Sequence, residues 1–166
     1  ILGVTPMHNF EGITPTVANV RPTSRGEIRI VSNDSRVYPK IKMNYLSTDE
    51  DRKVAALGLK IVRKIMLETE TFKKYEPEEY RPGIHITNDE ELVKAASDYA
   101  QTIFHPVGTC KMGSDDMAVV DDSLKVKGIK NLRVVDASIM PNITSGNTNA
   151  PTIMIAEKGA DMILNG

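Results

Sequence analysis

The stretch Ser145-Gly146-Asn147-Thr148-Asn149-Ala150-Pro151-Thr152 decides how the C-terminal part of this chain folds. Its glycine gives the backbone freedom, and its asparagines supply donors and acceptors without charge. Pro151 suits the first turn of a helix, where a missing N–H costs nothing. We therefore expect a helix from about Pro151 to Leu164. Its N-terminus would offer free N–H groups and partial positive charge to an anion, although an ordinary loop with an asparagine N-cap explains the same residues.

A second stretch lies upstream and reads His105-Pro106-Val107-Gly108-Thr109-Cys110-Lys111-Met112-Gly113. The proline disfavours helical geometry at His105. A histidine can accept the proton of an alcohol near neutral pH. A lone histidine is nevertheless more often an ordinary hydrogen-bonded residue, and we assign that role to His8 and His85.

A third stretch runs from Arg133 to Pro141 and contains Val134-Val135-Asp136-Ala137-Ser138. The apolar run Leu132–Val135 predicts a short strand that is buried on both faces. Asp136 then either hydrogen-bonds a ligand hydroxyl or caps the next turn. One cysteine and three scattered histidines predict no metal site, and no glycine-rich phosphate loop of the form G-x-G-x-x-G is present.

The first hundred residues combine strand and helix patterns. Residues 17–31 predict a β-hairpin with its turn at residues 21–26, and residues 40–45 alternate as a further strand. A helix is expected from Ser47 to about Glu68, with Ser47 and Glu50 as a capping box. A second helix should begin near Thr87 or Asn88 and end before Pro106. Its buried face is expected at Leu92, Ala96, Tyr99 and Ile103.

Composition excludes several classes of protein. The chain has 166 residues, 40% of them hydrophobic, which suffices for one packed domain. The formal net charge of -1 gives no basic excess for binding nucleic acid. Its one cysteine cannot form an internal disulfide, and no apolar run approaches the roughly 20 residues that span a bilayer. The chain begins at Ile1 without a Met, which a processed protein or a fragment would both explain.

In this order and spacing, the three stretches resemble the C-terminal signatures of the glucose-methanol-choline (GMC) oxidoreductase family, most closely its choline dehydrogenase branch. The likeness covers nearly the whole chain. Residues 20–28 look like the family's R-P-x-S-R-G element, and Asn44-Tyr45-Leu46-Ser47 also matches. The most specific match is the end, Asn149-Ala150-Pro151-Thr152-Ile153-Met154-Ile155-Ala156-Glu157-Lys158.

The resemblance implies an FAD enzyme that oxidises an alcohol by moving hydride to the flavin. By the same likeness, His105 takes the hydroxyl proton, and Asn149 helps to hold the oxygen. The helix after Asn149 would stabilise negative charge on the flavin. Further residues match the flavin contacts of the family: Asp136, Ala137, Asn147, Thr148, Ala150, Pro151 and Thr152.

The resemblance also sets the expected organisation. The fold class is α+β, a mixed or antiparallel sheet with helices on one face, plus a C-terminal strand and helix that belong to the flavin domain. Residues 1–104 would form part of the substrate domain, and residues 105–166 the active-site and flavin-contacting segment. The family's N-terminal Rossmann domain for FAD has no counterpart in these residues, so we expect a fragment rather than a processed protein. We therefore expect the isolated chain to be inactive and to bind FAD weakly.

Several alternatives stay open at this stage. One is a family member with non-redox chemistry, such as cyanohydrin cleavage, and another is a non-catalytic interaction domain. The partner is a small alcohol; choline is favoured by the likeness, yet few aromatic residues are present to hold its ammonium group. Oxygen and a quinone-type carrier both remain as acceptors, so the expected location is cytoplasmic or peripheral at an inner membrane. Homo-oligomerisation is undecided.

Overall fold

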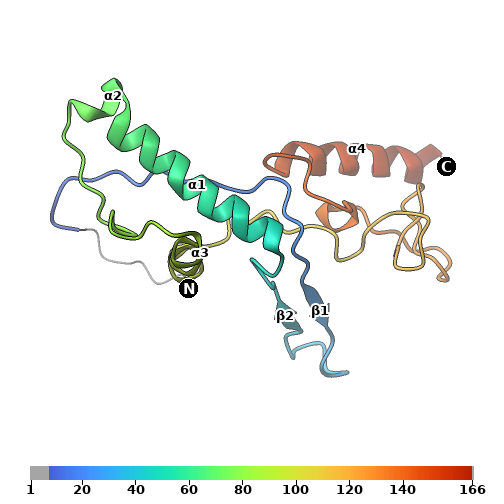
Figure 1. Ribbon diagram of the computed structural model, residues 1–166. Helices are drawn as coiled ribbons and strands as arrows, with labels where there is room; N and C mark the ends of the chain where they lie inside the picture. The colour runs from blue at the N-terminus through green and yellow to red at the C-terminus, as the bar shows by residue number, and fades with distance from the viewer. Residues whose placement is uncertain (1–7, 166) are drawn as a thin grey trace.

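A computed structural model describes residues 8–165, and it combines helices with a small antiparallel sheet. Figure 1 shows the first helices on one side, the last helix with its loops on the other, and the hairpin projecting below. This confirms the α+β fold class. No helix in this range is long and apolar enough to cross a bilayer. The elements are β1 (Glu27–Arg29), β2 (Lys40–Lys42), α1 (Asp49–Glu68), α2 (Glu70–Lys73), α3 (Asp89–Tyr99), η1 (Ala137–Ile139, a 3₁₀ turn) and α4 (Asn149–Asn165).

The hairpin pairs β1 with β2, with Ile28 opposite Ile41. The expected hairpin across residues 17–31 is therefore wrong, because residues 16–20 form no strand and residues 21–26 are not its turn. Thr23 and Ser24, which were expected in that turn, instead bind Asp51 at the start of α1. Both strands are exposed, and no helix of residues 8–165 packs on either face of the sheet. Strands of three residues offer too little surface for a helix to cover.

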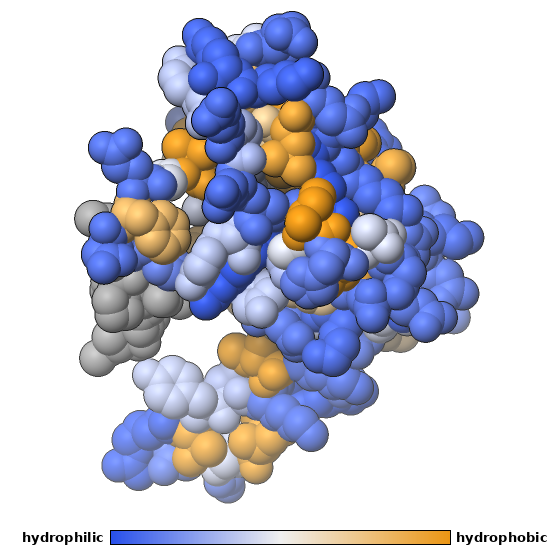
Figure 2. Space-filling model, turned by 60° about the vertical axis from the view of Figure 1, so that its left-hand side comes forward, coloured by the Kyte–Doolittle hydropathy of each residue, from blue (hydrophilic) through white to orange (hydrophobic). Residues whose placement is uncertain are grey.

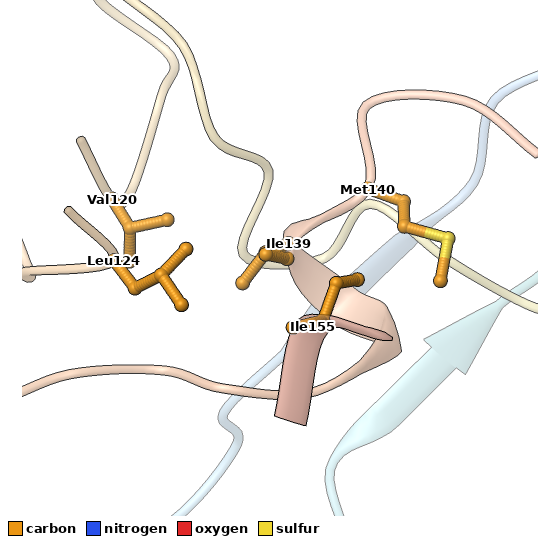
Figure 3. Packing of buried hydrophobic residues seen from close by; sticks show 5 residues of the cluster. All are labelled: Val120, Leu124, Ile139, Met140 and Ile155. Atoms are coloured by element: carbon orange, nitrogen blue, oxygen red, sulfur yellow. The ribbon is translucent and has the colours of Figure 1, made fainter. Parts of the chain in front are cut away.

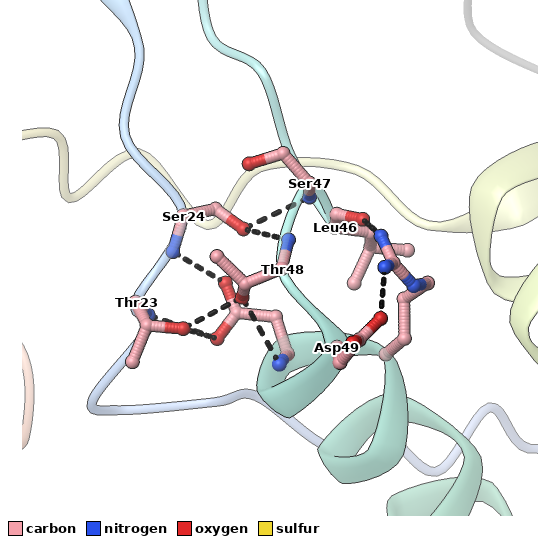
Figure 4. A network of polar contacts seen from close by, with 8 residues as sticks. Thr23, Ser24, Leu46, Ser47, Thr48 and Asp49 are labelled. Atoms are coloured by element: carbon pink, nitrogen blue, oxygen red, sulfur yellow. Dashed lines mark hydrogen bonds and ion pairs between the residues drawn. The ribbon is translucent and has the colours of Figure 1, made fainter.

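The start of α1 is organised by the carboxylate of Asp51, which is only 4% exposed. Asp51 accepts hydrogen bonds from the backbone N–H groups of Thr23 (2.9 Å) and Ser24 (2.8 Å), and from Asn19 (3.1 Å). The N-cap is Thr48, whose hydroxyl accepts from the N–H of Asp51. Figure 4 shows this network, in which Ser24 Oγ accepts from the backbone N–H of the two residues before α1.

The predicted capping box at Ser47 is thus displaced by one residue. Thr48 caps the helix in place of Ser47. Asp51, in place of Glu50, stands three residues after the cap, and its carboxylate faces the turn at residues 23–24. The helix itself ends at Glu68, as expected.

Asp51 gives a pH-dependent prediction. Burial raises the pKa of its carboxyl, but hydrogen bonds from Ser24 and Thr23 outweigh burial and lower it below the ordinary value near 3.8. A lowered folded-state pKa stabilises the protein above the unfolded-state pKa, and this contribution is lost as the pH falls through the folded-state pKa. Asp51→Asn should therefore cost about 1–3 kcal/mol at pH 7. The difference from wild type should begin to shrink near pH 4 and should close as the pH falls through the lowered folded-state pKa.

Urea unfolding at a series of pH values measures this difference. Asp49→Asn is the matched control, because Asp49 lies in the same helical turn but is exposed and binds only Arg52. A constant difference between Asp51→Asn and wild type from pH 7 to pH 3 would contradict the assignment.

The helices α1, α2 and α3 pack together, with Leu92 and Ala95 of α3 buried and α1 against both neighbours. Asn88 caps α3 as expected, but α3 ends at Tyr99, earlier than the expected stop before Pro106. Tyr99 and Ile103, which were predicted to lie on the buried face of this helix, are exposed. Between α2 and α3, Glu79 forms a two-pronged ion pair with Arg63 of α1, at 2.7 and 2.9 Å.

A second core supports the C-terminal part of the chain. Figure 3 shows its buried members, which are Val120, Leu124, Ile139, Met140 and Ile155. The predicted strand Leu132–Val135 is wrong: only an isolated bridge joins Arg133 to Lys125. Val134 and Val135 are half-buried and pack against the core, but Leu132 is 47% exposed, so the expected burial on both faces is wrong as well. α4 packs closely here because Gly159 has no side chain to meet Val135.

Candidate active site at the N-terminus of α4

His105 lies in a loop that is fixed on both sides. Before it, Phe104 has a φ of +64°, and its N–H donates to Thr102 Oγ1 at 3.0 Å. After it, Val107 packs against the C-terminal core, and the Cys110 N–H donates to the carbonyl oxygen of Ser138 at 3.0 Å. The backbone on both sides of His105 is therefore held by a local turn and by pairing with the segment around η1. The His105 side chain itself is half-buried.

The imidazole of His105 meets the start of α4. Its Nδ1 lies 2.9 Å from Oγ1 of Thr148, a residue 43 positions away that is only 7% exposed. Thr148 directly precedes α4, and its carbonyl oxygen accepts from the N–H of Thr152 at 3.0 Å. One nitrogen of the ring is thus occupied by a buried hydroxyl, and Nε2 has no hydrogen-bond partner among residues 8–165.

The N-terminus of α4 presents unpaired donors beside this histidine. The backbone N–H groups of Asn149 and Ala150 make no hydrogen bond within the described residues, and Pro151 has no N–H. Such a helix end carries partial positive charge and binds negative groups. The Asn149 side chain is exposed and likewise has no partner in the described range. The structure therefore places Asn149 next to the His105–Thr148 pair along the chain, without a hydrogen bond to His105.

The remaining predicted flavin contacts fall into two groups. The first group surrounds the start of α4 and consists of Asn147, Ala150, Pro151 and Thr152, of which Asn147 and Ala150 are exposed. The Thr152 hydroxyl is used locally, because it donates to the carbonyl oxygen of Thr148 at 2.6 Å.

Asp136 and Ala137 form the second group, at the start of η1. The Asp136 carboxylate accepts from the Ser138 N–H at 2.7 Å and from the Ser138 hydroxyl at 2.5 Å. Of the two roles that the sequence left open for Asp136, capping of the next turn is the one that these contacts make. Ala137 packs against the core. Asp136 is exposed, so its outer side stays accessible to a ligand hydroxyl.

Thr148 is the residue whose importance the sequence underestimated. It was expected only as a flavin contact, whereas the structure makes it the hydrogen-bond partner of the histidine. The small polar residues before Pro151 indicated a site near Thr148, but the contact between Thr148 and His105 depends on the tertiary fold. In the described range, no three His, Cys, Asp or Glu side chains gather as metal ligands would.

This arrangement can accept a proton and hold negative charge at one place. If the Nδ1–H of His105 donates to Thr148, Nε2 keeps a free lone pair that can accept a proton. The N–H groups at the start of α4 can stabilise an anion nearby.

Comparison with known proteins identifies the family of the chain. The family model for GMC oxidoreductase matches residues 22–156. The chain is 49% identical over 157 residues to the oxygen-dependent choline dehydrogenase of Proteus mirabilis (strain HI4320), covering 95% of this chain and 28% of that protein. It is 48% identical over 153 residues to an alcohol dehydrogenase [acceptor] of Pseudomonas putida, and the match covers 92% of this chain and 28% of that protein.

A solved structure shows the same fold. It belongs to a variant of the formate oxidase of Aspergillus oryzae RIB40, studied for modification of its FAD, and it superposes with a TM-score of 0.79 at 36% identity. The match covers 87% of this chain and 25% of the oxidase. The chain thus spans about 28% of the length of the curated relatives that it matches. With the family model matching most of its residues, this chain belongs to the GMC oxidoreductase family.

Proposed function

We propose that this chain is the C-terminal part of an FAD-dependent alcohol oxidoreductase, in which His105 accepts the hydroxyl proton of the substrate. The observation that carries the proposal is the 2.9 Å contact between His105 Nδ1 and Thr148 Oγ1 at the start of α4. This contact orients the ring and selects the nitrogen that faces away from Thr148 as the base. Asn149, the next residue, is suited to hold the substrate oxygen through its side-chain amide.

The donors at the start of α4 fit the negatively polarised edge of a flavin. When bound, the flavin supplies the acceptor for the hydrogen that leaves the substrate carbon as hydride. The N–H groups of Asn149 and Ala150 would hold that edge, since they point from an exposed helix end and have no partner in residues 8–165. Asp136 and Ala137 would contact a more distant part of the same cofactor.

The two parts of the chain would have different roles. Residues 1–104, with the hairpin and α1 to α3, would belong to the substrate domain. Residues 105–166 would carry the catalytic and flavin-contacting groups. The substrate would be a small alcohol, and choline is one candidate because a relative with 49% identity is a choline dehydrogenase.

The exposed surface supports a partner that covers much of this chain. The chain exposes 13099 Å², whereas a compact protein of 18.3 kDa exposes about 8,000 Å². An apolar stripe on α1 is open to solvent, with Leu57 56%, Ile61 49% and Ile65 44% exposed. The hairpin, the lower projection in Figure 2, likewise exposes apolar side chains, among them Ile28 and Ile41. The proposed cover is the flavin-binding part that the family's full-length members carry.

Titration with FAD tests this organisation. We expect the isolated chain to bind FAD weakly, because residues 8–165 offer one helix end and scattered polar groups but no glycine-rich pyrophosphate loop. The full-length protein should retain FAD through gel filtration. Sub-micromolar binding of FAD by the isolated chain would show that the cofactor site is complete within these residues, against the proposed division.

A further inference from the structure

The Arg21–Gly26 element lies far from His105 in the sequence. Hydrogen bonds on both sides hold its backbone in place. Its backbone N–H groups at Thr23 and Ser24 are bound by the buried Asp51 carboxylate. From the other side, the Asn44 side chain donates to the carbonyl oxygen of Arg25 at 2.9 Å. The backbone of Arg25 is therefore anchored both to α1 and to the end of the hairpin.

The Arg25 guanidinium is pre-oriented by its own turn. Its Nη1 donates to the carbonyl oxygens of Pro22 (2.9 Å) and Ser24 (3.0 Å). Its Nη2 then reaches Oδ1 of Asn142 at 2.5 Å, across 117 positions of sequence. A guanidinium held in this way loses little freedom on making the bond, and charge-assisted hydrogen bonds are stronger than neutral ones.

Asn142 lies in the loop between η1 and α4, directly after two residues that contact the loop of His105. The carbonyl oxygens of Met140 and Pro141 lie 3.2 and 3.7 Å from where a Cβ on Gly108 would stand, in the loop that carries His105. Six residues after Asn142 comes Thr148, the partner of His105. Within residues 8–165, the Arg25 bond is the one hydrogen bond made by any residue from 141 to 147.

We propose that Arg25 is a positioning residue, which holds the 141–148 loop through Asn142 and so keeps Thr148 against His105. This inference rests on the proposed function for its catalytic consequence. Without the Arg25 bond the loop keeps only its two ends, η1 and α4. Small displacements of a catalytic group can cost up to a hundredfold in rate, so a loop contact of this kind can matter although it never touches the substrate.

The test uses the full-length enzyme with Arg25→Ala, Asn142→Ala, the double variant and Asn142→Asp. We expect each single alanine variant to lower kcat at least tenfold at unchanged FAD content, and the double variant to be no worse than either single one. Asn142→Asp keeps an acceptor for Arg25 and should stay within threefold of wild type. Arg29→Ala is the matched control, because Arg29 is exposed on the hairpin and pairs only with Glu27.

Hydrogen–deuterium exchange of the peptide covering residues 148–156 gives a readout that does not depend on activity, because the Thr152 N–H is bound by the carbonyl oxygen of Thr148 and should exchange faster once Thr148 is released. Exchange should become faster in Arg25→Ala and Asn142→Ala, but not in Asn142→Asp or Arg29→Ala. Unchanged exchange, unchanged kcat, or an Asn142→Asp enzyme as impaired as Asn142→Ala would each overturn the inference. If wild type oxidised no alcohol, the proposed function would fail, while exchange would still decide whether Arg25 holds this loop.

Discussion

Replacing His105 with alanine is expected to lower kcat of the full-length enzyme about a hundredfold or more. General bases contribute about 10²–10⁴-fold to the rates of proton transfers that they assist. His105 is half-buried, its Nδ1 is bound to Thr148, and its Nε2 is free of partners in the described residues. Steady-state kinetics at saturating alcohol measure the effect, and flavin content checks that the cofactor is retained.

Two comparisons sharpen this test. His85→Ala should leave kcat unchanged, since His85 is an exposed residue of the loop before α3. Thr148→Val removes the hydroxyl that orients the ring and should lower kcat about tenfold, whereas Thr148→Ser should restore most of it. A loss below threefold in His105→Ala would remove this histidine from the role of base.

Replacing Gly26 with alanine is expected to destabilise the protein by about 2–4 kcal/mol. A Cβ at this position would lie 2.6 Å from the carbonyl oxygen of Met43 and closer still to that of Lys42. Backbone oxygens cannot rotate away as a flexible side chain can, so the hairpin and the turn that carries Arg25 would have to separate. The thermal unfolding midpoint of the full-length protein measures the loss.

Gly12→Ala provides the control for the effect of an added methyl group. The nearest atoms to a Cβ at Gly12 belong to the Phe10 ring, at 3.6 and 3.8 Å, which is ordinary contact. Its unfolding midpoint should stay close to that of wild type. Equal midpoints for Gly26→Ala and Gly12→Ala would show that the hairpin accommodates the methyl group, contrary to the packing seen here.

The helices could be predicted from the sequence because their signals are local. Capping residues placed the start of α1 within two residues and included the α3 cap at Asn88. The small polar run before Pro151 predicted the start of α4 two residues late. The cap of α1 moved from Ser47 to Thr48 because Ser24 binds the backbone of both residues, a contact that no local pattern reveals.

The strand predictions were wrong where a contact with a distant residue determines the local structure. The strand expected at residues 17–20 does not form, and Asn19 instead donates a hydrogen bond to the Asp51 carboxylate, 32 positions further on. For the candidate site, the motif order led to the proposal of His105 and the start of α4, yet it did not predict the Thr148 pairing or the Arg25 bridge. Both join segments that only tertiary packing brings together, across 43 and 117 positions.

In the proposed function, this chain supplies the proton-accepting wall of a flavin-dependent alcohol oxidation. Its most direct test is to mix the full-length protein anaerobically with a panel of small alcohols, choline included, and to follow the visible absorbance of its flavin. We predict that at least one alcohol bleaches the flavin, and that His105→Ala slows this step about a hundredfold. A protein whose flavin no alcohol bleaches, or that cleaves a cyanohydrin instead, would contradict the account.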